Sequence, residues 1–287
     1  MESYLRIVKK ILDEGVLKKN RTGVDTLSIA GVMFEHDMSK GFPLLTTKKM
    51  PFKLIASELE FFIKGITDKK WLQDRGNHIW DEWCTPEKVP YGNDEKTKER
   101  MKTERDLGPI YGWQWRNFGA KYISYNKKDG EGVDQLKELV EKLKKNPEDR
   151  RMIVTSWNPL DIKKMALPPC HYSFQVVVIK EELNLIWNQR SVDTALGLPF
   201  NIASYGLLLH LLAMEANLTE GRLVGFLGDT HIYVNHIEGL KKQLERQPYP
   251  LPKIRTKGFK SIFDWTYTDT EVVDYKCHPK IEFEIAV

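Results

Sequence analysis

The sequence has few cysteines, no concentration of one charge and no long apolar run. Its three cysteines, Cys84, Cys170 and Cys277, are widely spaced without a CxxC pair. This argues against a disulfide framework or a structural zinc site and suits a reducing compartment. Residues 1–10 are charged and lack the apolar core of a signal peptide. No segment approaches the ~20 apolar residues of a membrane span. These absences predict a soluble, cytoplasmic protein that does not enter a membrane.

The charges of the chain are nearly balanced. Its 44 lysines and arginines and 40 acidic residues leave a net charge of +4. The lysine runs alternate with acids, as in residues 96–100, whereas a nucleic-acid-binding chain usually concentrates its basic residues. We therefore expect a solvated surface of mixed charge, with a small positive excess that suits small anionic substrates.

The order of predicted elements favours one α+β domain spanning residues 1–287. Apolar spacing predicts helices at residues 2–14, 51–63, 135–145, 199–216 and 233–246. Apolar or alternating runs predict strands at residues 27–34, 151–157, 172–179, 183–189, 223–227 and 272–287. Residues 85–105 combine prolines and dense charge without apolar periodicity, so we expect a loop or surface insertion there.

Cys170 is the first candidate for chemistry. It lies in ALPPCH (166–171), which is followed by NQRSVDTALGLPFN (188–201). A lone cysteine is most often a small buried hydrophobic residue. Here Arg190 adds a cation that can hold an anion and favour the thiolate, which is the reactive form of cysteine. Asn201 adds a side-chain amide that can read a polar ring. The combination indicates a cysteine nucleophile acting on an anionic substrate.

These two runs, together with NRTG (20–23), HIWDEW (78–83), RR (150–151) and GDTHIY (228–233), resemble the flavin-free thymidylate synthase family. The motifs occur in the family's order along the whole chain. The resemblance implies methylation of dUMP to dTMP, with 5,10-methylenetetrahydrofolate as one-carbon and hydride donor and with no metal or flavin. It also implies a large twisted mixed β-sheet with helices on one face, the other face forming a homodimer interface.

The resemblance further implies three overlapping sets of site residues. The catalytic set is Cys170, Glu58, Tyr111, Arg190, Asn201 and Asp193. The dUMP-binding set is Arg21, Arg150, Arg151, Arg190, Ser191, Asp193, Asn201, His231 and Tyr233, with Arg150 and Arg151 donated across the dimer. The folate-binding set is Lys48, Trp80, Trp83, Asp193, Phe200, Ala286 and Val287.

The residue types suit these roles. A thiolate of Cys170 that adds to uracil C6 makes C5 enol-like, and guanidinium groups bind phosphate in a bidentate way. The amide of Asn201 offers an acceptor for N3–H and a donor for O4, a pattern that cytosine does not match. Burial of Glu58 in an apolar helix should raise its pKa towards the range useful for proton transfer. Flat aromatic walls at Trp80 and Trp83 suit a pterin.

Plainer structural interpretations remain open beside the functional ones. They are core positions for Trp80, Trp83, His231 and Tyr233, a helix start for Asn201, a solvent-facing position for Glu58, and a turn for Arg150 and Arg151. Cys277 forms a second Cys-His dipeptide, but nothing around it matches a catalytic motif, so we interpret it as incidental. Glu60 and Phe61 replace residues common in the family, which leaves the local packing open.

Other functions fit part of the pattern. A pyrimidine-monophosphate hydroxymethylase shares the fold and the cysteine, but water rather than hydride attacks its exocyclic methylene; Trp80 and Asn201 favour methylation. An RNA-binding regulator is a second alternative, since some members of the family bind their own mRNA. The dispersed charge gives that alternative little support. A purely structural role leaves the arginines unexplained.

Overall fold

Alternating apolar and polar residues build the main sheet. The computed structural model describes residues 1–20 and 23–284. In β7, Leu183, Leu185 and Trp187 are fully buried and the residues between them reach the opposite face, as expected of a strand with one core face. In spatial order the strands are β1 (Val16–Lys18), β2 (Thr26–Asp37), β8 (Thr219–Tyr233), β7 (Glu182–Asp193), β6 (His171–Ile179) and β5 (Ile153–Thr155). β7 and β8 run parallel and the other neighbours antiparallel, so the sheet is mixed.

Helical periodicity produces the elements that cover this sheet. In α6 the buried residues Leu136, Leu139, Val140 and Leu143 recur at helical spacing, and the side chain of Asp134 caps the first turn. The helices are α1 (Glu2–Glu14), α2 (Phe52–Ile63), α3 (Lys70–Gln73), α4 (Glu95–Thr103), α5 (Tyr111–Asn117), α6 (Gln135–Lys145), α7 (Gly197–Ala216) and α8 (Ile237–Leu244). The 3-10 turns in the described residues are η1 (Met38–Lys40), η2 (Ile162–Lys164), η3 (Val234–His236) and η4 (Tyr267–Asp269). The bounds predicted for α1 and α6 are confirmed.

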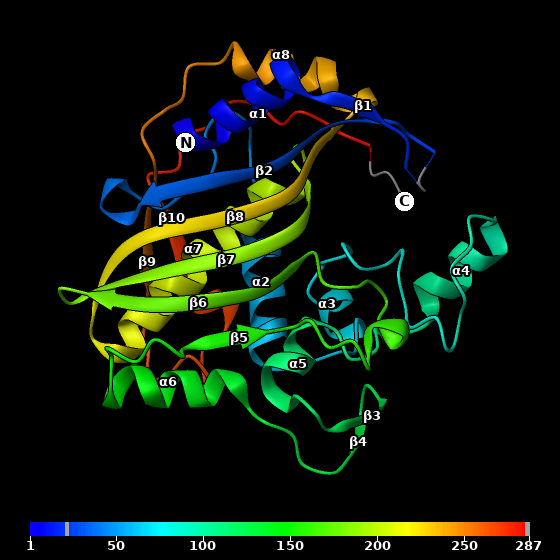
Figure 1. Ribbon diagram of the computed structural model, residues 1–287, viewed down its shortest axis with the longest axis vertical. Helices are drawn as coiled ribbons and strands as arrows, with labels where there is room; N and C mark the ends of the chain where they lie inside the picture. The colour runs from blue at the N-terminus through cyan, green and yellow to red at the C-terminus, as the bar shows by residue number, and fades with distance from the viewer. Residues whose placement is uncertain (21–22, 285–287) are drawn as a thin grey trace.

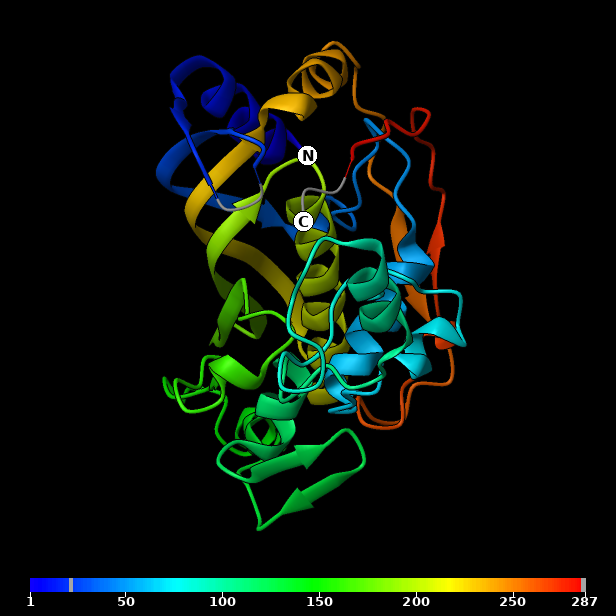
Figure 2. The same ribbon diagram turned by 90° about the vertical axis from the view of Figure 1, so that its right-hand side faces the viewer.

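The 20-residue helix α7 forms the centre of the core. By length and composition it could cross a membrane, contrary to the sequence-based expectation that no segment approaches this length. However, 78% of its most apolar window is buried inside the protein, as in the core helix of a globular domain. Figure 2 shows α7 between the sheet and α2. The helix therefore supplies the apolar layer on which the sheet packs.

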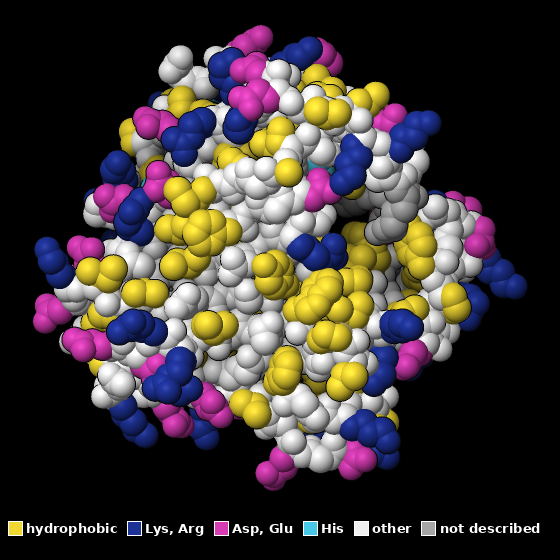
Figure 3. All heavy atoms as spheres, viewed as in Figure 1, with side chains coloured by type: hydrophobic (Ala, Val, Ile, Leu, Met, Phe, Trp, Pro, Cys, Tyr) yellow, Lys and Arg dark blue, Asp and Glu magenta, His cyan; other side chains and the backbone are white. Residues whose placement is uncertain are grey.

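The helices gather on one face of the sheet, and Figure 1 looks onto the other face with α7 behind it. Met33 of β2 and Phe226 of β8 are register partners on this open face, 42% and 49% exposed. Ile153 of β5 is also exposed. Figure 3 shows hydrophobic side chains spread over this face. The predicted dimer interface would lie on this face, because apolar side chains exposed to water are unfavourable and a partner that covers them removes this cost.

The segment at residues 85–105 differs from the expected loop. It contains α4, whose first turn is capped by the side chain of Asp94, which accepts a hydrogen bond from Thr97 N at 3.0 Å. Met101 is the one buried residue of α4, so the sequence of this helix has no apolar periodicity from which it could be predicted. The prediction of a loop is wrong for α4, while the interpretation as an insertion stays a prediction.

The predictions for the last third of the chain need further correction. The strand predicted at residues 223–227 belongs to the longer β8, which still includes Tyr233, so the helix predicted from Tyr233 begins only after it. Up to residue 284, where the described part of the chain ends, the strand predicted at residues 272–287 is limited to β10 (Thr270–Val273), which pairs with β9 (Lys253–Thr256). Asp274 then adopts a left-handed φ of 61°, which ends the extended backbone. A second short ribbon joins β3 (Lys121–Ser124) to β4 (Lys127–Asp129).

The two unusual residues of α2 are both accommodated. Glu60 is buried, and its carboxylate binds Lys64 Nζ at 2.5 Å and accepts a hydrogen bond from Tyr267 N at 2.8 Å. Phe61 is also buried, and its ring lies 5.9 Å from that of Trp71. Glu60 therefore ties α2 to η4, and a buried carboxylate is tolerated because it is both paired and hydrogen-bonded.

Candidate functional site

The strand order brings the predicted residues to one edge of the main sheet. The parallel strands β7 and β8 both end there, and β6 begins there because His171 pairs with Gln189. A cavity of about 690 Å³ opens at this edge. The predicted residues that line it are Glu58, Trp80, Trp83, Tyr111, Cys170, Arg190, Ser191, Asp193, Phe200, Asn201, His231 and Tyr233.

Cys170 directly precedes β6, and Arg190 lies beside it on β7. The backbone N of Arg190 donates to Cys170 O at 2.8 Å. The guanidinium of Arg190 donates to the carbonyl oxygens of Pro169 (2.9 Å) and Pro168 (2.8 Å), and it lies 5.5 Å from the ring centroid of Trp157. These contacts hold the cation against the segment that carries the thiol, where a positive charge favours a thiolate and attracts an anion.

Two neutral rings support the backbone of Cys170. The hydroxyl of Tyr111 accepts a hydrogen bond from Cys170 N at 2.8 Å, and its ring stacks on His171 with centroids 4.4 Å apart. His171 Nδ1 lies 2.9 Å from the hydroxyl of Tyr205. Burial lowers the pKa of His171 to about 3 and raises the pKa of Tyr111 well above its usual value. At neutral pH His171 is therefore uncharged, and its ring packs against that of Tyr111.

Glu58 reaches the cavity from α2. Trp80 Nε1 donates a hydrogen bond to Glu58 Oε1 at 2.8 Å. Desolvation raises the pKa of Glu58 from 4.5 to about 7, although the hydrogen bond from Trp80 acts in the opposite direction. The sequence-based expectation of a raised pKa is thus confirmed. A carboxyl group that titrates near neutrality can both donate and accept a proton under working conditions.

Gln189 is a buried residue of the site that the sequence analysis did not assign. Its Nε2 donates to Asn201 Oδ1 at 3.0 Å and to Ser191 O at 3.1 Å, while its Oε1 accepts from Trp187 Nε1 at 3.2 Å. This chain of hydrogen bonds fixes the orientation of the Asn201 amide at the start of α7. The position of Gln189 next to Arg190 in the same sequence run was the available signal.

Lys18 and Asp229 were also not predicted, and both line the cavity near His231. Lys18 Nζ lies 2.5 Å from Asp229 Oδ2, and this ion pair joins β1 to β8. His231 Nδ1 is 3.2 Å from Asp229 O, and its ring is 5.4 Å from that of Tyr233. Asp229 belongs to the run GDTHIY, which could have indicated it. No motif points to Lys18, because only strand pairing brings it here.

One wall of the cavity is aromatic. The rings of Trp80 and Trp83 meet edge to face with centroids 6.2 Å apart. Beside this wall, Asp193 Oδ1 accepts hydrogen bonds from Ala195 N (2.9 Å) and Leu196 N (3.2 Å), which shapes the turn that leads into α7. The cavity therefore has a polar half around Cys170 and Arg190 and a flat apolar half around the tryptophans.

Comparison with known proteins agrees with this geometry. The sequence model described as thymidylate synthase matches residues 2–287. The chain belongs to the thymidylate synthase family. It is 45% identical to a thymidylate synthase of Mycoplasma pneumoniae and 44% identical to that of Mycoplasma mobile, over the full length of both chains. It is also 50% identical to a bifunctional dihydrofolate reductase-thymidylate synthase of Paramecium tetraurelia, covering 99% of this chain but 61% of that protein.

Some residues expected from the thymidylate synthase family do not line the cavity. Lys48 is buried; its Nζ donates to Ala195 O at 2.5 Å and lies 4.8 Å above the ring of Phe283. Burial lowers the pKa of Lys48 to about 8. Arg150 and Arg151 are exposed on the surface. The remaining predicted residues, Arg21, Ala286 and Val287, lie outside the described part of the chain. The roles of these residues stay predictions.

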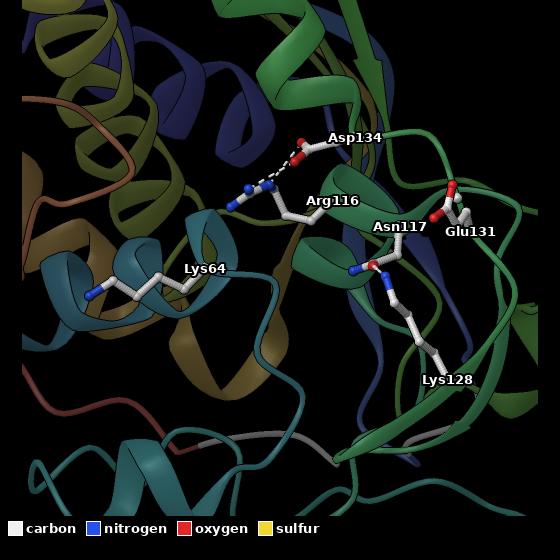
Figure 4. A pocket seen from close by; sticks show the side chains of 7 residues that line it. Lys64, Arg116, Asn117, Lys128, Glu131 and Asp134 are labelled. Atoms are coloured by element: carbon white, nitrogen blue, oxygen red, sulfur yellow. Dashed lines mark hydrogen bonds and ion pairs between the residues drawn. The ribbon is translucent and has the colours of Figure 1, made fainter.

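A second, polar hollow of about 410 Å³ lies between α2, α5 and the start of α6 (Figure 4). Its charges are largely paired. Arg116 forms two hydrogen bonds of 2.8 Å with Asp134, and Lys128 Nζ lies 2.7 Å from Asn117 Oδ1. Figure 4 shows Lys64 extending away from these pairs. We therefore regard this hollow as a structural feature of the surface. Among residues 1–20 and 23–284, no group of three or more His, Cys, Asp or Glu side chains could hold a metal ion.

Proposed function

We propose that the protein is a thymidylate synthase, which methylates dUMP to dTMP with 5,10-methylenetetrahydrofolate and releases dihydrofolate. The observation that carries this proposal is the position of Cys170 beside Arg190 in a cavity that also contains the Asn201 amide. Membership of the family and the two full-length relatives named thymidylate synthase support the same activity.

The polar half of the cavity suits the nucleotide. Arg190 would bind the phosphate while it stabilises the Cys170 thiolate, and the Asn201 amide would accept from N3–H and donate to O4 of uracil. The thiolate adds to C6, and the electron pair moves to C5, which then attacks the one-carbon unit. Loss of the C5 proton expels the folate nitrogen from the one-carbon unit and leaves a methylene on C5. Hydride from tetrahydrofolate reduces this methylene to methyl as the thiolate leaves C6, which regenerates the enzyme. Ser191, His231 and Tyr233 would hold the nucleotide from β7 and β8.

Proton movements at the pyrimidine fall to Glu58 and Tyr111. Glu58 has a pKa of about 7, so both of its protonation states are populated at neutral pH. It would pass protons to and from O4, while Tyr111, held against the backbone of Cys170, would act near the C5 proton. Each group needs only a short proton path, because both line the same cavity as Cys170.

The apolar half suits the folate. A pterin and its aminobenzoyl ring are flat and apolar on their faces, and Trp80, Trp83 and Phe200 offer matching surfaces. Asp193 would hydrogen-bond the pterin edge. Lys48 would meet the glutamate tail, and this contact requires its side chain to leave the carbonyl of Ala195. The bound folate supplies the one-carbon unit and then the hydride that reduces it to methyl.

Assembly as a homodimer completes the proposed site. The open sheet face carries exposed Met33, Phe226 and Ile153, whose burial against a second copy would be favourable. Arg150 and Arg151 are exposed and lie outside the cavity of their own chain, which fits donation to the phosphate site of a partner. We also propose a cytoplasmic location. Binding of the protein's own mRNA stays a separate hypothesis, which a steep salt dependence of RNA affinity would support.

A direct assay tests the proposed reaction. Enzyme, dUMP and 5,10-methylenetetrahydrofolate should give an absorbance increase from dihydrofolate together with an equimolar amount of dTMP. Release of tetrahydrofolate and a hydroxymethylated nucleotide would instead establish the hydroxymethylase alternative. The absence of any dUMP-dependent folate turnover would contradict both functions.

A further inference from the structure

Lys69 is a buried cation that the chemistry above does not use. It directly precedes α3 and is 1% exposed. Its Nζ donates to three backbone carbonyl oxygens, those of Asp81 (3.2 Å), Trp83 (2.9 Å) and Met101. An ammonium group has three donor hydrogens, so this geometry uses its full capacity.

The three carbonyls belong to two segments of different character. Those of Asp81 and Trp83 lie in the turn at residues 78–83, which carries the aromatic wall of the cavity. The carbonyl of Met101 lies in α4, which Figure 1 shows at the periphery of the molecule. The backbone N of Lys69 also donates to Arg105 O at 2.9 Å. Lys69 therefore forms hydrogen bonds both to residues 85–105 and to the turn that carries the aromatic wall.

Three carbonyl acceptors and two nearby carboxylates surround the ammonium group. Burial lowers the pKa of Lys69, whereas the carboxylates of Asp81 and Glu104 act in the opposite direction. Asp81 is itself held in place by Gln73 Nε2, which donates to its carboxylate at 2.8 Å. If the ammonium were removed, three carbonyl oxygens would lose a charged donor, and such bonds are among the stronger ones in proteins.

The aromatic wall is also connected to the proposed proton carrier. Trp80 donates its hydrogen bond to Glu58 and touches the ring of Trp83, so a shift of this turn would displace both rings from the cavity. The nucleotide half has separate supports, since Cys170 and Arg190 are held by the backbone at the start of β6 and by Tyr111.

We propose that Lys69 is a positioning residue for the folate half of the cavity, and that residues 85–105 contribute to folate binding through it. This inference rests on the proposed function, because it takes Trp80 and Trp83 as the folate wall. It gives residues 85–105 a function that the charged, mostly exposed helix α4 does not reveal by itself. Lys69 itself does not line the cavity and would act only through the turn that it holds.

The test is steady-state kinetics of Lys69→Met, which keeps the length and apolar stem of the side chain. We expect the KM for 5,10-methylenetetrahydrofolate to rise about tenfold, because small displacements of positioning groups are costly. The dissociation constant for dUMP should change less than twofold. Lys70→Met is the matched control: the neighbouring lysine is exposed and pairs with the exposed Asp74, so both constants should stay at wild-type values.

Amide hydrogen exchange adds a direct measurement. In Lys69→Met, peptides covering residues 78–84 should exchange faster, and peptides of β6 and β7 should not. Unchanged folate KM and unchanged exchange would overturn the proposal. A parallel loss of folate and dUMP binding would also overturn it, because that result indicates general destabilisation. If Lys69→Met does not fold, Lys69→Arg takes its place, because it keeps the charge with a different donor geometry. The folate KM and the dUMP dissociation constant of this variant then test the proposal in the same way.

Trp83→Ala separates this inference from the proposed function. If Trp83→Ala leaves the folate KM unchanged, the aromatic wall does not bind folate and the proposed function fails at that point. If Trp83→Ala raises the folate KM while Lys69→Met does not, the wall is correct and the positioning role of Lys69 is wrong.

Discussion

At the scale of single residues, the two Cys-His dipeptides differ in their surroundings. Cys170 lines the cavity, and its backbone is fixed by Tyr111 and Arg190. Cys277 lies in the C-terminal tail, where the following residue donates its backbone N–H to Thr46 O at 2.8 Å. All three cysteines are described, and none forms a disulfide bond. Local sequence alone makes the dipeptides look alike, whereas the chemistry available to them differs.

We therefore predict that Cys170→Ala abolishes turnover and that Cys277→Ala retains nearly all of it. The segment that carries Cys170 holds the guanidinium of Arg190, which can stabilise a thiolate and bind a phosphate. A fluorinated dUMP analogue that lacks the removable C5 proton should form a covalent complex with folate and enzyme. Peptide mass mapping should place this adduct on Cys170; an adduct on Cys277, or none, would contradict the assignment.

Glu58 should make the stability of the protein depend on pH. Its pKa is raised from the ordinary value of 4.5 to about 7 in the folded chain, so the folded chain binds this proton more tightly than the unfolded chain does. The stabilisation from this group is complete below pH 4.5 and declines as the pH rises towards 7. Relative to Glu58→Gln, the wild type should thus be less stable at pH 8 than at pH 5. Urea denaturation of both proteins at the two pH values measures this difference.

The same substitution should also affect catalysis. Glu58→Gln keeps the shape of the side chain but cannot exchange a proton, so turnover should fall by about a hundredfold, a typical loss for a general acid–base group. Equal pH dependence of stability in both proteins would show that Glu58 is not desolvated. Unchanged turnover would remove it from the proton path.

At the scale of elements, the contact between α2 and α5 places Tyr111 in the site. Gly112 follows Tyr111, and a Cβ at this position would lie 2.4 Å from Phe62 O and 2.7 Å from Phe62 Cα. These are backbone atoms of a buried helix, which cannot move aside as a flexible side chain would. Glycine is required here because the two helices approach closely. The same approach stacks Tyr111 on Phe62, with ring centroids 4.8 Å apart.

Gly112→Ala should therefore push α5 away from α2. We expect a loss of about 1–3 kcal/mol in the free energy of unfolding, as for other overpacked contacts, together with reduced turnover because Tyr111 moves. Gly92→Ala is a suitable control, since the three atoms nearest to a Cβ there belong to the side chains of Thr97 and Asp94, at 3.1 Å or more. Chemical denaturation and activity assays measure both effects. Wild-type stability for Gly112→Ala would show that the helices adjust freely.

At the scale of the whole molecule, the proposed phosphate site draws on arginines of a second chain. The cavity of one chain contains Arg190 but neither Arg150 nor Arg151. Arg151 pairs with Asp149 at 3.0 Å, but the side chain of Arg151 is 85% exposed and can also reach groups outside its own chain. A phosphate bound by several guanidinium groups gains a charge-assisted hydrogen bond from each.

We predict that each active site is built from two chains. Cys170→Ala and the double variant Arg150→Ala/Arg151→Ala should each be nearly inactive alone. After reversible denaturation of a mixture, activity should return to roughly a quarter of wild type, because about half of the dimers are mixed and each of these has one intact site. If the arginines serve their own chain, both sites of a mixed dimer stay defective and no activity returns.

The sequence by itself determined the elements with strong local patterns and the residues that lie in motifs. Amphipathic spacing predicted the bounds of α1 and α6, and the runs around Cys170 and Arg190 predicted most of the cavity. Such signals are local, because a helix or a nucleophile run depends on neighbouring side chains. The α+β class and the family followed from the same patterns.

The tertiary structure decided whatever depends on contacts between distant segments. Lys48 donates to the carbonyl of Ala195, 147 positions away, and this contact takes it out of the cavity wall. Lys18 reaches Asp229 only because β2 lies between β1 and β8 in the sheet. Lys69 lies between Asp68 and Lys70, yet it is buried, and three backbone carbonyls satisfy its ammonium group. Pairing of this kind has no local signature, since its free energy arises only when the whole chain has folded.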